Sequence, residues 1–409
     1  MPVNILAQVF SEGLDSIPYG WTVTKIASVF AVLYALKWFF NGAKNGSERN
    51  MHSKVILVTG GTAGIGAEVV RGLADRGAQI VLLVRQPLSD PFLVDYIEDL
   101  RTQTNNELIT AEYVDLESLH SIRQFATKWV DNAPPRRLDM IVLCASTMTP
   151  PGVKATATED GLESTWGVNY MANFHLLSIL SPALRAQPPD RDVRIIFGTC
   201  ASYMAGKIPE SFNNSGKPNT KKSAKTEPGQ LDLAPSAIYA TSKLALMTFA
   251  VAFQKHLSNY ARPDKKPMNA RVIMVDPGWT RTPGMRRYLT FGSLWGLAVY
   301  LIMWPIWWLV LKSGDAGAQT FLYAAMEARW GRGDGKYFLK ECRQVKWSRP
   351  EIDDEDLQKK LWESSEKTIE LLEKESAKRR AMEKKEKEKS EGTSTAKEAN
   401  RTARSSGKK

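Results

Sequence analysis

Cysteine is scarce in this chain, which has only three such residues in 409, at Cys144, Cys200 and Cys342. They are far apart and odd in number, which argues against a disulfide framework and indicates a reducing compartment such as the cytosol. The sequence also lacks the ligand spacing of a zinc site, so we predict no bound metal.

Positive charge is in excess, but the motifs that would make it a nucleic-acid surface are missing. The formal net charge is +11, and the basic residues are scattered along the chain. No RNA-binding signature accompanies them. Because basic groups near a membrane are attracted to its anionic lipids, a membrane surface explains the bias equally well. We therefore expect no nucleic-acid partner.

Long uncharged runs are few, and the first follows the N-terminal segment 1–22. Residues 23–40 are mostly apolar, with Lys25 and Lys37 near the ends. A basic leader and a small-residue cleavage site are absent, which argues against a secretory signal peptide. About 18 residues at 1.5 Å each can just cross, or lie within, a hydrocarbon core. We predict a membrane anchor, spanning or monotopic. Basic residues stand at its end and after it, at Lys37, Lys44, Arg49 and Lys54, and they are expected to place the main body in the cytosol.

The second apolar run, residues 289–311, has no charged residue and is rich in tryptophan, whose ring favours membrane interfaces. Pro305 interrupts any helix there. Hydropathy alone predicts a spanning helix, but the chain continues with an expected helix around Ala316–Glu327 and an expected strand at Lys336–Leu339. A single crossing would separate these elements from the earlier strands of one sheet. We therefore predict an insertion that dips into the membrane and returns, or lies in its interface.

The C-terminal part, residues 351–409, is rich in Glu and Lys, with a few apolar residues on a helical spacing. Beyond Lys374 nearly every residue is charged, and the end is rich in Ser, Thr and Lys. This composition predicts a solvated helix that gives way to disorder and has no catalytic role.

A glycine-rich turn lies between a buried apolar run, Val55–Thr59, and an expected helix, Ala67–Arg76. Such a turn brings backbone N–H groups and a positive helix end against a pyrophosphate. The pattern T-G-x-x-x-G-x-G over Thr59–Gly66 resembles the short-chain dehydrogenase/reductase family. The resemblance implies an α/β fold: a Rossmann-type doubly wound parallel sheet in a single domain over residues 54–340. The turn residues assigned to cofactor binding are Gly60, Thr62, Gly64, Ile65 and Gly66.

Two further positions are expected at the adenosine end of the cofactor. Arg85 ends the second expected strand, Gln79–Val84. An acidic residue there would bind the ribose 2′-hydroxyl of NAD, whereas Arg can pair with the 2′-phosphate of NADP. We therefore predict NADP(H). Asp115 matches the family position beside the adenine amino group.

Tyr239 and Lys243 are four residues apart, which places both on one face of a helix. A phenol titrates near pKa ~10, too high for easy proton exchange at neutral pH. An adjacent ammonium favours the phenolate and is expected to ease that exchange. The resemblance implies that Tyr239 is the proton donor and acceptor for hydride transfer between nicotinamide and a carbonyl or alcohol.

The resemblance assigns further site residues. Asn169 matches the family asparagine whose backbone helps to carry a proton-relay water; its alternative role is a polar contact within a helix. Pro277 and Gly278 match the segment after the sixth strand that packs against the nicotinamide. Thr280 fits a cofactor-contacting threonine, with Thr282 as the alternate.

The chain departs from the family pattern in two places. Where the family reads Asn-Asn-Ala-Gly, this chain has Leu143-Cys144-Ala145-Ser146. Direct alignment places Cys200 where the family has its catalytic serine, and a thiol is a weak hydrogen-bond donor. Ser202 is two residues further on and would face the same way in an extended strand. We favour Ser202 slightly over Cys200 for that role. An insertion at Gly206–Pro235 is expected to be a surface loop beside the substrate mouth.

The combination of motifs is most similar to the retinol-dehydrogenase-like branch of the family, with the insertion and tail of fungal oxidoreductases of lipid droplets and the endoplasmic reticulum. The resemblance implies a lipophilic alcohol, aldehyde or ketone as substrate, either retinoid-, sterol- or fatty-like. The expected location is the endoplasmic reticulum membrane or the droplet monolayer. The oligomeric state is left open, with a homodimer as one candidate. The competing hypothesis is a catalytically impaired nucleotide-binding scaffold on the same lipid surface.

Overall fold

The centre of the protein is a parallel β-sheet. The computed structural model describes residues 19–208, 234–333 and 335–406. Within them, one sheet has the order β3-β2-β1-β4-β5-β6-β7-β8, and every neighbouring pair is parallel except β7 with β8. The strands are β1 Val55–Thr59, β2 Gln79–Val84, β3 Ile109–Tyr113, β4 Met140–Leu143, β5 Val193–Gly198, β6 Ala270–Asp276, β7 Lys336–Lys340 and β8 Arg343–Gln344.

Helices cover both faces of this sheet, which is why its central strands are apolar without alternation. One face packs against α3 Gly64–Ala74, α4 Pro91–Thr104 and α12 Gly314–Met326. The other packs against α5 Leu119–Val130, α7 Ala172–Arg185 and α8 Pro235–Ser258. A short helix, α6 Ser164–Trp166, and a π-helical turn, Gly167–Met171, precede α7. The predicted Rossmann-type doubly wound sheet is confirmed.

The strand order reverses between β1 and β4, because β2 and β3 lie on one side of β1 and the later strands on the other. In open α/β sheets, ligands bind outside the carboxyl ends of the strands at such a reversal. The glycine turn follows β1 and residues 144–147 follow β4, so the topology brings both segments to this crevice.

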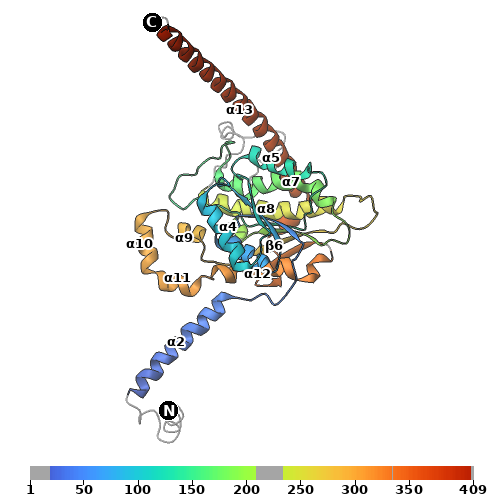
Figure 1. Ribbon diagram of the computed structural model, residues 1–409. Helices are drawn as coiled ribbons and strands as arrows, with labels where there is room; N and C mark the ends of the chain where they lie inside the picture. Colours follow the sequence, from blue (N-terminus) through green and yellow to red (C-terminus); the bar gives the residue numbers. More distant parts are fainter. Residues whose placement is uncertain (1–18, 209–233, 334, 407–409) are drawn as a thin grey trace, which may run out of the picture.

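The first apolar run forms α2 Gly20–Asn41, which projects from the body of the protein (Figure 1). Its part Trp21–Asn41 is long and apolar enough to cross a membrane, and its most apolar window is not buried in the protein. Helix α8 passes the same test of length and composition, but it is largely buried and belongs to the core. Residues 1–18 lie outside the described part of the chain.

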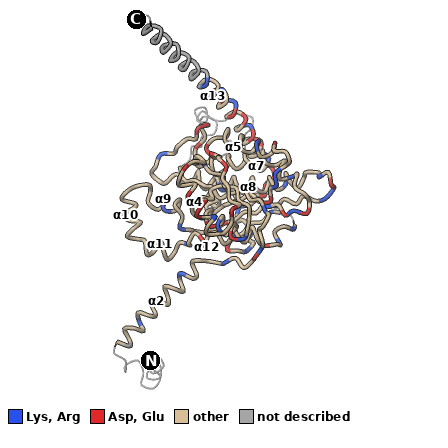
Figure 2. Tube along the Cα trace, viewed as in Figure 1, with Lys and Arg blue, Asp and Glu red and all other residues tan. Residues whose placement is uncertain are grey.

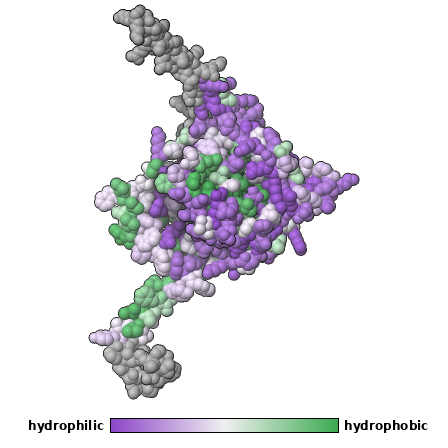
Figure 3. Space-filling model, in the orientation of Figure 1, coloured by the Kyte–Doolittle hydropathy of each residue, from purple (hydrophilic) through white to green (hydrophobic). Residues whose placement is uncertain are grey.

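The second apolar run is a helical excursion, made of α9 Pro283–Leu289, α10 Leu294–Ile302 and α11 Trp304–Val310. It leaves the domain after β6 and comes back before α12 (Figure 1). Its two ends are joined, because Lys312 N donates to Trp279 O at 2.9 Å and Arg281 N donates to Lys312 O at 2.9 Å. Apolar side chains gather on its outer surface and on α2 (Figure 3).

The tail forms a long helix, α13 Glu355–Ser406, where the sequence predicted a solvated helix giving way to disorder. Its first half packs on α5 and α8, and Leu361, Ile369 and Leu372 join the core cluster on that face. The expectation of a solvated helix is therefore wrong for this half. The reason is that its apolar positions complete a face that α5, α7 and α8 leave open. Beyond this half the helix extends away from the body (Figure 1). On the part of α13 next to the body, Lys and Arg lie among Asp and Glu (Figure 2).

Candidate active site

The glycine turn at the end of β1 has a backbone that side chains would not allow. Gly60 and Gly64 have φ of +66° and +59°, which residues with a side chain rarely adopt. A Cβ on Gly60 would lie 2.8 Å from the Ala145 backbone, and one on Gly66 would meet the Gly60 carbonyl oxygen. Helix α3 begins at Gly64, so its N-terminal N–H groups face the crevice. The turn, with half-buried Thr62 and Ile65, therefore fits a dinucleotide pyrophosphate.

Arg85 follows β2 directly, at the edge of the same crevice. Its side chain is 67% exposed and lies 3.5 Å from Glu117, an ion pair that exposure to water weakens. Asp115, just after β3, accepts a hydrogen bond from Glu117 N at 2.9 Å through Oδ1. The two positions expected to bind the adenosine end of the cofactor thus lie at neighbouring strand ends.

Tyr239 and Lys243 lie on the second and third turns of α8. Lys243 is buried, and its Nζ donates to the Gly198 carbonyl oxygen at 3.0 Å and lies 5.7 Å from the centre of the Tyr239 ring. An ammonium has three protons to donate. Gly198 accepts one of them, which leaves donors for the hydroxyls of a nicotinamide ribose.

The pKa of the Tyr239 phenol is raised well above its usual value, chiefly by burial and further by the adjacent Cys200. Burial also lowers the pKa of the Lys243 ammonium. The sequence predicted the opposite sign for the tyrosine, because it considered the ammonium alone. Desolvation of the phenol is the larger effect in the protein by itself.

Cys200, two residues after the end of β5, contacts the phenol, with Sγ 3.5 Å from the Tyr239 hydroxyl oxygen. The slight preference for Ser202 assumed that the strand continued. That premise is wrong, because β5 ends at Gly198 and residues Ala201–Ala205 form a 3₁₀ helix. The two-residue alternation of a strand therefore does not carry Ser202 to the position of Cys200.

Ser146 is a further candidate site residue, which the sequence motifs did not single out. Its hydroxyl interacts with the Tyr239 phenol and lowers the pKa of that group. The flanking backbone is fixed, since Ala145 N donates to Thr59 Oγ1 at 3.3 Å and Thr147 N donates to Asn169 Oδ1 at 2.8 Å. The available signal was the departure itself: a hydroxyl stands where the family has glycine.

Asn169 is buried in the π-helical turn and connects two parts of the site. Its Nδ2 donates to Thr147 O at 2.9 Å and to Ser242 Oγ at 3.2 Å, and Ser242 Oγ donates to the Tyr239 carbonyl oxygen at 2.8 Å. Its own carbonyl oxygen accepts from Asn173 Nδ2 at 2.8 Å. The side chain therefore holds the loop after β4 against the start of α8.

The loop after β6 covers the crevice from another side. Gly278 has φ +76°, and its N–H donates to the buried carboxylate of Asp276 at 2.9 Å. Buried Thr280 donates to Gly278 O at 3.4 Å and packs against Gly317. Thr282 caps α9 and lies beside Gly64 of the glycine turn. The predicted segment from Pro277 thus borders the glycine turn. Thr282, the alternate to Thr280, is the residue that lies beside it.

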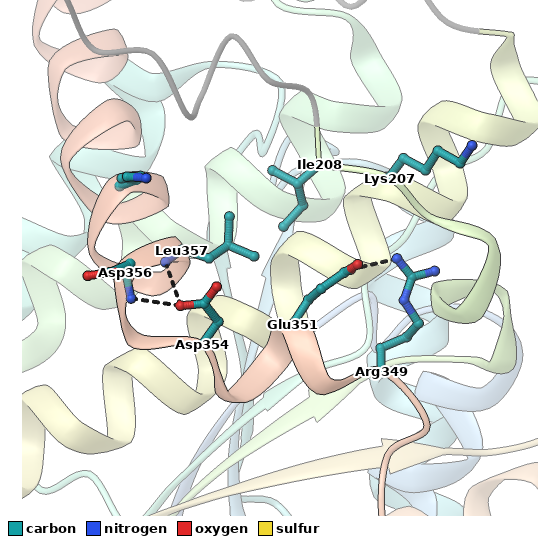
Figure 4. A pocket seen from close by; sticks show the side chains of 8 residues that line it. Lys207, Ile208, Arg349, Glu351, Asp354, Asp356 and Leu357 are labelled. Carbon is teal, nitrogen blue, oxygen red and sulfur yellow. Dashed lines mark hydrogen bonds and ion pairs between the residues drawn. The ribbon is translucent and has the colours of Figure 1, made fainter.

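A cavity of about 510 Å³ lies elsewhere, at the start of α13 (Figure 4). Two of its three acidic side chains are already engaged: Glu351 pairs with Arg349, and Asp354 accepts from the backbone N–H groups of Asp356 and Leu357. None of the predicted site residues lines it, so it is separate from the crevice. The insertion expected beside the substrate mouth falls mostly within residues 209–233, outside the described part of the chain.

Comparisons with known proteins agree with this geometry. A family model described as short chain dehydrogenase matches residues 54–205. The uncharacterized oxidoreductase pbr1 of Schizosaccharomyces pombe is 41% identical, over 93% of this chain and 98% of that protein. Retinol dehydrogenase 13 of Homo sapiens is 30% identical, over 85% of this chain and 94% of that protein. Polyprenol dehydrogenase of Mus musculus is 30% identical, over 76% of this chain and 82% of that protein.

One family assignment accounts for the long matches with these relatives. It also accounts for the glycine turn and the Tyr239–Lys243 pair. The chain belongs to the short-chain dehydrogenase/reductase family, in its retinol-dehydrogenase-like branch, and is an oxidoreductase of alcohol and carbonyl groups.

Proposed function

We propose that the protein is an NADP(H)-dependent oxidoreductase that interconverts a lipophilic alcohol and its aldehyde or ketone at a lipid surface. The observation that carries the proposal is the position of Tyr239 and Lys243. Both project from α8 toward the carboxyl ends of the central strands, where Lys243 contacts Gly198 and Tyr239 contacts Cys200. The apolar excursion α9–α11 follows the loop that borders the same crevice.

The preference for NADP(H) rests on Arg85. A guanidinium at the end of β2 can form paired hydrogen bonds with a 2′-phosphate, and Glu117 is its acidic neighbour at 3.5 Å. The bound cofactor would supply or accept the hydride. The glycine turn and Lys243 would hold its pyrophosphate and ribose.

Tyr239 is the acid and base in this proposal. The raised pKa of the phenol keeps it protonated near neutral pH, so it is ready to donate a proton to a carbonyl oxygen during reduction. In oxidation the same oxygen accepts the proton of the alcohol. Ser146 and Cys200 flank it and supply the groups that can polarise the substrate oxygen.

The lipophilic substrate class is supported by the surface beside the crevice. Trp295 and Leu294 on α10 are each 85% exposed, and Ile302 is 78% exposed. A contiguous exposed apolar surface marks a site for lipid or protein. Two relatives are named for isoprenoid-type alcohols, retinol and polyprenol. Such a substrate would enter from the lipid phase.

The lipid surface in the proposal is the endoplasmic reticulum membrane or the monolayer of a lipid droplet, with the catalytic domain on the cytosolic side. Helix α2 is exposed along its length, and the excursion leaves and re-enters the domain on one side of the sheet. A droplet monolayer accepts helices that dip and return, but its oil core does not suit a chain that crosses into water.

The test is an assay of the purified full-length protein in phospholipid vesicles with retinal, a long-chain aldehyde and a water-soluble aldehyde, each with NADPH or NADH. We expect turnover with the lipophilic aldehydes and a higher kcat/KM for NADPH. Turnover confined to the water-soluble aldehyde would contradict the substrate class. Tight NADPH binding without turnover would favour the scaffold hypothesis, which the thiol in the serine position supports.

A further inference from the structure

A partly buried ion pair lies between the apolar excursion and the cofactor loop. Lys312, at the end of the excursion, is 6% exposed, and its Nζ pairs with Glu341 of the turn between β7 and β8. A Cβ on Gly278 would lie 3.2 Å from this Nζ, and one on Gly42 would lie 2.7 Å from it. The ammonium is therefore enclosed by two glycines, one from the cofactor loop and one from the linker after α2.

The backbone of Lys312 is fixed to the same loop. Its N–H donates to Trp279 O, its carbonyl oxygen accepts from Arg281 N, and Thr280 is its bridge partner. Thus Lys312 contacts the loop from Gly278 to Arg281 through both its side chain and its backbone.

Glu341 connects this pair to the linker that follows α2. Its Oε2 accepts from Ala43 N at 3.0 Å, two residues after the end of the helix. The linker continues along α12, where Asn45 N donates to Gln319 Oε1 at 3.1 Å and Ser47 Oγ donates to Glu327 Oε2 at 2.6 Å.

Helix α2 also contacts the excursion directly, at α11. Lys37 Nζ donates to the carbonyl oxygens of Trp308 and Leu311 at 2.7 and 3.0 Å. The two helices pack together at this point. A lipid-bound α2 would therefore be attached both to the excursion and, through Glu341 and Lys312, to the cofactor loop.

We propose that Lys312 and Glu341 are positioning residues that fix the Gly278 loop for the cofactor and join that loop to the linker after α2. The Lys312 side chain is buried and that of Glu341 is 34% exposed. Loss of Glu341 therefore leaves a buried ammonium unpaired and able to displace the loop, and loss of Lys312 removes the side chain that contacts the loop. The inference rests on the proposed use of NADP(H), but the attachment of the linker can be measured without cofactor.

The first arm measures the NADPH dissociation constant of full-length protein by tryptophan fluorescence. We expect Lys312→Met and Glu341→Gln each to weaken NADPH about tenfold, as for coupled sites. The double variant should be no weaker than either single one, because it leaves no unpaired charge. Lys374→Met, which breaks an exposed pair with Glu370 on α13, should bind as the wild type does. A role in stability alone would lower the melting temperature and leave the dissociation constant unchanged; that result would overturn the inference.

The second arm measures tryptic cleavage after exposed Lys44 in the absence of cofactor. Glu341→Ala removes the acceptor for Ala43 N, whereas Glu341→Gln retains one. We expect faster cleavage in Glu341→Ala than in Glu341→Gln, and equal rates would overturn the link to α2. A wild-type protein that binds no NADPH would contradict the proposed function, whereas the cleavage comparison would still decide the inference.

Discussion

The surroundings of one phenol decide how this site handles protons. Tyr239 is flanked by the Cys200 thiol, 3.5 Å away, and by the Ser146 hydroxyl. The thiol raises the pKa of the phenol, and the hydroxyl lowers it. A thiol donates a hydrogen bond weakly, so Ser146 is the better donor to a substrate oxygen. The site therefore has its hydroxyl on the loop after β4 instead of at the end of β5.

Cys200→Ser tests this account of the phenol. The change removes a neighbour that raises the pKa of Tyr239, so the phenolate forms at lower pH. Alcohol oxidation needs the phenolate, and its rise with pH should therefore begin at lower pH, with a kcat about 3- to 10-fold higher, as for one gained hydrogen bond. The measurement is the pH profile of kcat for oxidation. Cys342→Ser is the control, and a profile that stays in place or moves to higher pH would contradict the account.

Sequence reasoning proposed Tyr239, Lys243 and the glycine turn as site residues, because side-chain type and spacing alone define these motifs, and the fold brings them to one edge of the sheet. Its argument for Ser202 assumed a continuing strand, but the end of a strand is set by tertiary contacts that a two-residue alternation does not include. Ser146 was missed since a departure from a motif was interpreted only as a loss.

Helix α10 exposes large apolar side chains, with Trp295 85% and Ile302 78% exposed. The double variant Trp295→Glu/Ile302→Glu should bind phospholipid vesicles about tenfold or more weakly. In the wild type both apolar side chains would leave water for the lipid, and the glutamates would lose that gain. The unfolding free energy should change little, since both side chains are exposed. Vesicle co-sedimentation gives the measurement. Phe92→Glu, on α4 and equally exposed at 85%, is the matched control, and an equal loss there would contradict a lipid-binding role for the excursion.

The first half of α13 is part of the folded domain. Trp362 lies among Phe174, Phe249 and Phe253, and the Tyr170 hydroxyl is 2.7 Å from Ser365 Oγ. Leu361→Ala should therefore reduce the free energy of unfolding by about 2–5 kcal/mol in urea titrations. Leu371→Ala, on the same helix but 51% exposed, should cost about 0.5 kcal/mol or less. Equal effects of the two substitutions would mean that the helix is not docked.

At the element scale the sequence predicted β1 and β2 with their observed bounds, because buried parallel strands are short, continuous apolar runs. The return of the excursion to the domain was also predicted, from the need to keep β7 in the sheet with β6. The docking of α13 was not, because its apolar residues are sparse among charges and their partners lie on α7 and α8, far away in sequence.

In the whole molecule, the catalytic crevice and the apolar elements meet at the loop after β6. This loop borders the glycine turn, leads into the excursion and is held by Lys312, which also reaches the linker after α2. The arrangement would place a reaction on lipophilic molecules beside the surface that holds them.

The most direct test of the central claim follows the hydride itself. NADPH with deuterium at its transferable position is incubated with retinal and the full-length protein in phospholipid vesicles, and the alcohol is analysed by mass spectrometry. The account predicts one deuterium in the product, with the rate about 10²- to 10⁴-fold lower in Tyr239→Phe, although that variant still binds NADPH. Equal deuterium transfer by Tyr239→Phe and the wild type would contradict it.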